Sequence, residues 1–153
     1  MEKKNRRPVR SFRDLDVLQN TYKSSIVVAR KILPKLPECE EYDLHSQLSR
    51  SSKAIRCLIA EDYAKKHQKS GFQKYIDDAM GECNETIVSL GHVKDIYEIE
   101  VNLCDELVDV YDKAARQLYT LAEAWDSFKN RRRKTKPSND TGRDDEQRLT
   151  LYK

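Results

Sequence analysis

The sequence predicts an all-α protein: an antiparallel up-down-up-down four-helix bundle with a short basic N-terminal arm and a flexible basic C-terminal tail. Apolar residues recur every three or four positions in four long stretches, a spacing that keeps side chains on one face of a helix. No stretch alternates apolar and polar residues as a half-buried strand does. The 153 residues include only four Gly and four Pro, too few turn formers for a β-sandwich.

The first helix is predicted over residues 11–33. Ser11 and Asp14 have the spacing of a capping box, in which each side chain accepts a hydrogen bond from a backbone amide at the start of a helix. Pro34 and Pro37 cannot continue the helix and therefore end it.

Three further helices are predicted over residues 42–69, 72–90 and 98 to about 129. Ser70 is expected to cap the third helix, and Gly91 is expected to adopt the left-handed conformation just past its end. The buried stripe of the second helix is predicted to contain Leu44, Leu48, Ser51 or Ser52, Ile55, Ile59 and Tyr63. Four helices of comparable length joined by short connections favour an antiparallel bundle.

The length suits one domain with a single core. We expect a basic arm at residues 1–10, the bundle at 11–130 and a flexible charged tail at 131–153, whose composition has too few apolar residues to form a core. The longest apolar runs are far too short to span a membrane, and no signal-peptide core follows the basic start. Four widely spaced cysteines indicate reduced thiols in a cytoplasmic protein and predict neither a metal site nor a cofactor.

Charge is distributed unevenly along the chain. The formal net charge is +3, but residues 1–10 carry +4, residues 129–136 carry +6 and residues 137–153 carry −1, which leaves −6 on residues 11–128. Attraction to phosphate should therefore come from the two basic segments.

The basic segments are the clearest sign of a partner. Without interleaved aromatic residues, they are expected to contact backbone phosphates of RNA or DNA without stacking on bases. A solubilising tail with no specific partner is the competing interpretation. The candidate nucleic-acid-binding residues here are Lys3, Lys4, Arg6, Arg7, Arg10, Arg131, Arg132, Arg133, Lys134 and Lys136.

A second basic set lies on the predicted second helix. Arg50, Lys53 and Arg56 recur every three residues, so they lie along one side of that helix. They form either a solvated face or a ridge that binds phosphates, which an oligomeric ring would repeat as a continuous band.

Residues 36–90 contain a more specific pattern. It begins Leu36-Pro37-x-x-Glu40-x-Tyr42-x-Leu44-x-x-Gln47-Leu48-x-Arg50-Ser51-Ser52 and continues through Ile59-Ala60-Glu61, Tyr75-Ile76, Ala79, Gly81 and Glu85. With Ser11-Phe12-Arg13-Asp14-Leu15, it resembles the four-helix-bundle proteins encoded in intervening sequences of bacterial large-subunit rRNA genes. The accessory variability determinants of retroelements are similar in fold. Two positions depart from the family pattern: Leu58 replaces its usual Asn, and Asp62 its usual Gly.

The resemblance implies a homo-oligomer, a pentamer by preference, with a role involving nucleic acid and a reverse transcriptase or another protein as a possible partner. Five polar residues within the pattern are expected to have structural or subunit-interface roles instead of catalytic ones, because no partner or pocket for catalysis is evident. They are Glu40, Tyr42, Gln47, Arg50 and Glu61, and Glu61 is expected near Tyr42 or Arg50 in a buried polar network.

Tyrosines occur throughout the predicted bundle. Each is expected to bury its ring and keep its hydroxyl in water, as suits bundle edges and subunit contacts. They are Tyr22, Tyr42, Tyr63, Tyr75, Tyr97, Tyr111 and Tyr119.

The sequence thus predicts a non-enzymatic, homo-oligomeric bundle that binds RNA or DNA backbone through its basic arms. It would act as an accessory factor in a nucleic-acid process such as reverse transcription or an rRNA-related function, without a membrane or cofactor. The alternative is a protein-interaction scaffold that does not bind nucleic acid.

Overall fold

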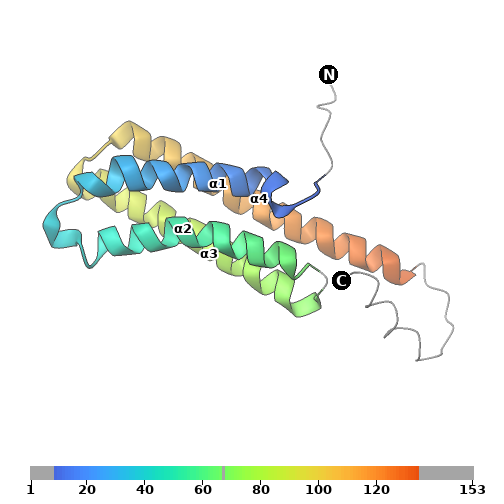
Figure 1. Ribbon diagram of the computed structural model, residues 1–153. Helices are drawn as coiled ribbons and strands as arrows, with labels where there is room; N and C mark the ends of the chain where they lie inside the picture. The colour runs from blue at the N-terminus through green and yellow to red at the C-terminus, as the bar shows by residue number, and fades with distance from the viewer. Residues whose placement is uncertain (1–8, 67, 135–153) are drawn as a thin grey trace, which may run out of the picture. The chain divides into compact units, whose positions relative to one another are not determined.

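The computed structural model describes residues 9–66 and 68–134, which contain four α-helices and no strand (Figure 1). This confirms the predicted all-α class and the number of helices. The helices are α1 (Asp16–Val27), α2 (Leu44–Ala64), α3 (Lys69–Tyr97) and α4 (Val101–Lys134). The chain divides after Ala122 into two compact units. The first contains α1, α2, α3 and α4 as far as Ala122, and the rest of α4 belongs to the second.

The predicted capping box at the N-terminal side of α1 is confirmed. The Ser11 hydroxyl accepts a hydrogen bond from the backbone N–H of Arg13 at 3.0 Å, and the Asp14 carboxylate accepts one from the Ser11 N–H at 2.9 Å. The box caps a 3₁₀ turn, η1 (Phe12–Asp14), that precedes α1. After α1 the chain continues as a π-helical segment, η2 (Val28–Ile32).

Two short 3₁₀ turns connect this segment to α2. They are η3 (Leu33–Lys35) and η4 (Glu38–Glu40). Pro34 lies within the first turn and Pro37 immediately before the second, as expected for residues that cannot continue an α-helix.

Helices α2 and α3 pack side by side and run in opposite directions (Figure 1). Ser51 near the start of α2 contacts Thr86 in the second half of α3, whereas Lys65 just after α2 contacts Tyr75 near the start of α3. Helix α1 also packs against α2, since Arg56 lies over the Tyr22 ring.

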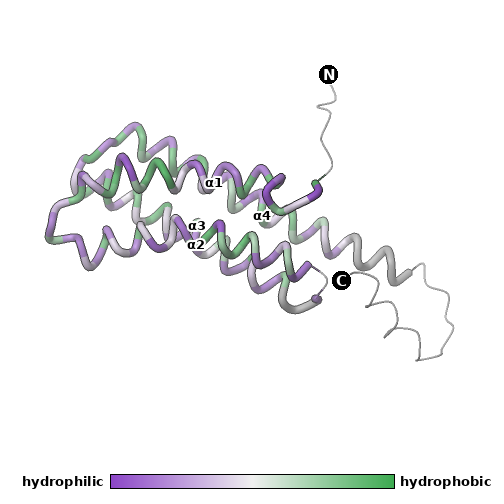
Figure 2. Tube along the Cα trace, in the orientation of Figure 1, coloured by the Kyte–Doolittle hydropathy of each residue, from purple (hydrophilic) through white to green (hydrophobic). Residues whose placement is uncertain are grey.

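The core is built from the apolar faces of the helices. Figure 2 shows apolar and polar residues interspersed along each helix, as expected when one face of each is buried. The side chains with 0 or 1% exposure include Val28, Ile32, Leu48, Ile55, Ile59, Ile76, Leu90, Val93, Ala114 and Leu118.

The boundaries of α3 differ from the prediction. It begins at Lys69, where Gln68 is the N-cap without a side-chain hydrogen bond, so Ser70 is not the cap. Gly91 does not end the helix either. Instead, Glu98 adopts the left-handed conformation, with φ of 52°, and its N–H bonds the carbonyl oxygen of Lys94 at 3.0 Å.

Helix α4 also extends further than predicted, because it continues through Lys134. The basic run Arg131–Lys134, assigned by the sequence to a flexible tail, therefore lies on helical backbone. The remainder of the predicted tail, from residue 135, is outside the described residues.

Candidate functional site

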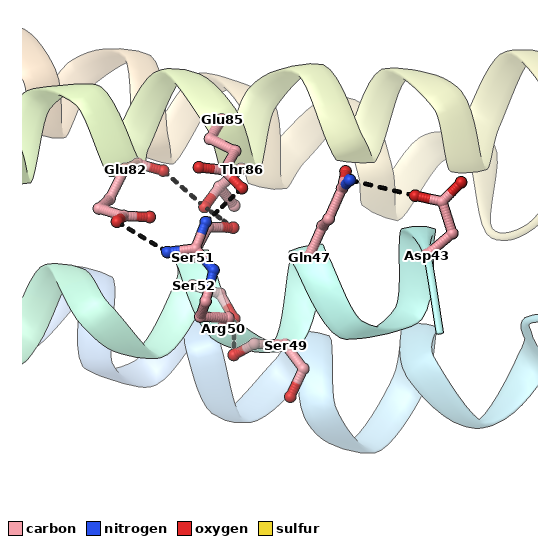
Figure 3. Close-up of polar contacts among 9 residues, drawn as sticks. All are labelled: Asp43, Gln47, Ser49, Arg50, Ser51, Ser52, Glu82, Glu85 and Thr86. Carbon is pink, nitrogen blue, oxygen red and sulfur yellow. Dashed lines mark hydrogen bonds and ion pairs between the residues drawn. The ribbon is translucent and has the colours of Figure 1, made fainter. Parts of the chain in front are cut away.

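A polar layer joins α2 to α3 at the place where the sequence pattern is most specific (Figure 3). The Arg50 guanidinium donates to the carboxylates of Glu82 at 3.0 Å and Glu85 at 2.5 Å. Beside this ion pair, the fully buried Thr86 hydroxyl lies 2.9 Å from the Ser51 hydroxyl. We call these five residues the α2–α3 polar layer.

The positive charge of Arg50 is paired with carboxylates of its own chain. The hydrogen bonds that Arg50 donates to Glu85 and Glu82 raise the pKa of its guanidinium. Two carboxylates facing one guanidinium leave a local charge of −1, so Arg50 is already compensated before any phosphate approaches. Its role in this structure is to connect α2 with α3.

Replacing Arg50 by Gln is expected to lower the free energy of unfolding by about 1 kcal/mol, because Glu82 and Glu85 would face each other without their shared counter-charge. Urea denaturation measures the change. The control is Lys53→Gln, since Lys53 is exposed and, among the described residues, donates a hydrogen bond to Ser49 of its own helix at 2.9 Å. Equal effects of the two substitutions would contradict a structural role for the ion pairs.

The three cations of the predicted basic ridge on α2 contact different parts of the structure. Arg50 contacts α3, Lys53 contacts Ser49 within α2, and the Arg56 guanidinium lies 4.0 Å from the centre of the Tyr22 ring of α1. All three residues remain exposed. Of these three, Lys53 and Arg56 have no carboxylate partner among the described ion pairs.

Glu40 anchors the segment that precedes α2. Its carboxylate accepts hydrogen bonds from the Tyr97 hydroxyl and from the Leu44 N–H. The bond from Tyr97 holds the pKa of Glu40 below its usual value, and the same bond raises the pKa of Tyr97 to about 12. Glu40 thus fixes the start of α2 to the end of α3.

The other proposed interface residues do not form a common network. Gln47 donates to Asp43 at 3.1 Å, and Tyr42 is 91% exposed. Glu61 is exposed and lies three helical turns along α2 from Arg50, too far for contact. The predicted buried network linking Glu61 to Tyr42 or Arg50 is therefore wrong.

The buried carboxylate of α2 is the neighbouring Asp62. Asp62 is 2% exposed, and its Oδ1 has no hydrogen-bond partner among the described residues. Burial raises the pKa of Asp62 to about 7. The predicted buried stripe of the second helix ended at Tyr63 and did not include Asp62. Asp62 follows Ile55 and Ile59 by seven and three positions, so helical spacing alone was a signal for its burial.

Tyr111 contradicts the expectation that each tyrosine keeps a wet hydroxyl. Its residue is fully buried, and the hydroxyl has no hydrogen-bond partner among the described residues. Burial raises the pKa of this phenol. Tyr111 is therefore a core residue of α4.

Half of the ten basic-arm candidates lie on described backbone. Lys3, Lys4, Arg6, Arg7 and Lys136 lie outside the described residues, and Arg10 is described and exposed. Arg131, Arg132, Arg133 and Lys134 belong to the last turn of α4, where the backbone alone is described.

No helix in the described part of the chain is long and apolar enough to cross a membrane. In residues 9–66 and 68–134, no group of three or more His, Cys, Asp or Glu side chains is arranged to hold a metal ion. All four cysteines are free, with Cys83 and Cys104 buried and the other two exposed.

Comparison with known families finds a match that spans α1, α2, α3 and part of α4. A family model described as 23S rRNA-intervening sequence protein matches residues 13–120. The chain belongs to this family. The match contains the whole α2–α3 polar layer and ends before the basic run of α4. No curated protein and no solved structure matches the chain.

Proposed function

We propose that this member of the 23S rRNA-intervening sequence protein family is a non-enzymatic factor that binds the phosphate backbone of RNA or DNA through its basic terminal segments. The observation that carries the proposal is the charge distribution: +4 on residues 1–10 and +6 on residues 129–136, against −6 on the residues between them. An acidic body repels a polyanion, so the terminal segments must provide the attraction.

The contacts in the α2–α3 polar layer support this assignment. Arg50 is compensated by two carboxylates, which makes the middle of α2 a weaker phosphate site than its sequence suggests. The run Arg131–Lys134 contains four consecutive cations with no acidic residue between them. The family description connects such proteins with rRNA genes, and we propose an accessory role in an rRNA-related process or in reverse transcription, in the cytoplasm.

We further propose that the four helices form an up-down-up-down bundle that assembles as a homo-oligomer, a pentamer by preference. The opposite directions of α1 and α2, and of α2 and α3, support this topology (Figure 1). Val88 and Ile96 are 58% and 61% exposed and lie eight residues apart on α3, so they give that helix an apolar strip for subunit contact.

Light scattering at micromolar concentration is expected to give a mass several times that of one chain, because the apolar strip on α3 would be covered in an oligomer. The result is expected to be the same at high salt, since the contact is apolar. A monomer mass under both conditions would contradict the assembly.

Binding of generic RNA and DNA by the full-length protein at two salt concentrations tests the function. We expect binding at low salt that weakens steeply at high salt for both nucleic acids, since phosphate contacts release counterions. Absence of binding at low salt would replace this function with the protein-interaction scaffold, in which the exposed helix faces bind another protein.

A further inference from the structure

A hollow between α1 and α2 combines positive charge with aromatic rings. It has a volume of about 280 Å³, and its walls include the apolar side chains of Phe12, Leu18 and Tyr22. Three cationic residues complete it: Arg13, Lys23 and Arg56. We call it the α1–α2 hollow.

The charged residues that line the α1–α2 hollow are all cations. No carboxylate lines it, and Arg13, Lys23 and Arg56 have no carboxylate partner among the described ion pairs. In contrast, Arg50 and Lys94 are each paired with acidic residues. Three uncompensated cations in one concavity, on a body whose net charge is −6, make a local site for an anion.

The aromatic part of the hollow is accessible and held in place. Tyr22 is 41% exposed, and the Arg56 guanidinium lies 4.0 Å from the centre of its ring. Arg13, which belongs to η1, is tied to α1, because the Gln19 amide donates to the Arg13 carbonyl oxygen at 2.8 Å. A flat stacking surface is therefore present beside the cations before any ligand arrives.

We infer that the α1–α2 hollow binds one nucleotide of a single-stranded nucleic acid, with the base stacked on the Tyr22–Arg56 pair and the adjoining phosphate contacted by Arg13 and Lys23. This inference rests on the proposed function and names a second contact for the same ligand. Aromatic rings and guanidinium planes are the surfaces on which unpaired bases stack. A phosphorylated peptide would use the cations but would leave the stacking surface without a role.

The size of the hollow agrees with a single nucleotide. Pockets for whole drug-sized ligands begin at about 300 Å³. The hollow is at that lower limit, so the rest of a strand must pass over the surface. Duplex nucleic acid is excluded from the stacking contact because its bases are already stacked on one another.

The test measures the affinity of the full-length protein for an unstructured RNA oligonucleotide, a DNA oligonucleotide of the same sequence, and the RNA annealed to its complement. The variants are Tyr22→Leu, Tyr22→Phe and Arg56→Gln. Matched controls are Tyr119→Leu, a tyrosine 55% exposed on α4, and Arg30→Gln, an exposed arginine on η2. Circular dichroism verifies that each variant is folded.

Tyr22→Leu is expected to weaken single-strand binding about five-fold or more, because one base loses its stacking partner. Its salt dependence should be unchanged, and Tyr22→Phe should bind like the original protein. Arg56→Gln should also weaken single-strand binding, because it removes the guanidinium plane of the stacking pair. Tyr119→Leu and Arg30→Gln should weaken single-strand binding less than Tyr22→Leu and Arg56→Gln do. Tyr22→Leu should not alter the affinity for the duplex. Comparison of the RNA and DNA strands shows which of the two supplies the nucleotide.

If the oligonucleotides bind but Tyr22→Leu and Arg56→Gln behave like their controls, the hollow is not a nucleotide site and the proposed function stands without it. Should Tyr22→Leu fail to fold, Arg56→Gln against Arg30→Gln decides the question. If no oligonucleotide binds the original protein at low salt, both the proposed function and this inference are wrong.

Discussion

Replacing Asp62 by Asn is expected to stabilise the protein by up to about 4 kcal/mol at pH 8 and to have almost no effect at pH 4. The carboxyl is buried on α2, and no described residue is a hydrogen-bond partner of its Oδ1, so burial disfavours the charged form. Its pKa is about 7 in the folded state and near 3.8 when the chain is unfolded.

The sign follows from the protons bound in each state. Between pH 3.8 and about 7 the folded protein holds a proton that the unfolded chain has released, so the free energy of unfolding falls as pH rises through this window. Above it, both states are ionised and the folded state retains the full cost of the buried charge. The Asn variant has no proton to lose and avoids that cost.

Urea denaturation of the original protein and the Asp62→Asn variant across this pH range measures the effect. The control is Asp78→Asn, which removes an exposed carboxylate from α3 and should follow the original protein at every pH. A constant difference between the original protein and Asp62→Asn from pH 4 to pH 8 would show that Asp62 does not titrate in the folded state as its burial requires.

Neutralising the basic run of α4 should have the largest effect on binding. Substitution of Arg131, Arg132, Arg133 and Lys134 by Gln is expected to weaken RNA binding about a hundred-fold or more at moderate salt, because several phosphate contacts disappear together. Gln is a good helix former, so the last turn of α4 should persist.

A matched variant separates the position of these charges from their number. It replaces four exposed cations of the body by Gln: Arg30, Lys31, Lys74 and Lys113. Its net charge is the same as that of the α4 variant, but its affinity should decrease far less. Equal losses would mean that RNA responds to overall charge and not to the basic run.

Helical periodicity was sufficient to predict the fold class and the position of each helix. Leu48, Ile55 and Ile59 are buried on α2 as their spacing requires, and the Ser11 capping box lies where its sequence pattern indicated. These features depend on residues close together in the chain.

Helix ends were harder to predict because the same residue type can lie either within a helix or at its end. Gly91 was expected to end α3, yet a helix accommodates a glycine at modest cost when the residues around it are helix formers. The end is set instead by Glu98, a residue with no intrinsic preference for the left-handed conformation, whose φ of 52° reflects the turn into α4.

The candidate site depended on contacts between helices, which one sequence does not specify. The spacing of Arg50, Lys53 and Arg56 predicted one ridge, but α3 provides carboxylates for Arg50 whereas α1 provides an aromatic ring for Arg56. Asp62 was overlooked because a charged residue is seldom assigned to a buried stripe, although its spacing from Ile59 placed it there.

The salt dependence of RNA binding tests the central claim most directly, because its slope counts the phosphates that the protein contacts. If about five charges of residues 129–136 meet phosphates, they should contribute roughly −3.5 to −4.5 to the log-log slope of the full-length protein. The variant with Gln at positions 131–134 should give a slope that is shallower by about 3. Identical slopes for the two proteins would contradict binding through the basic run of α4.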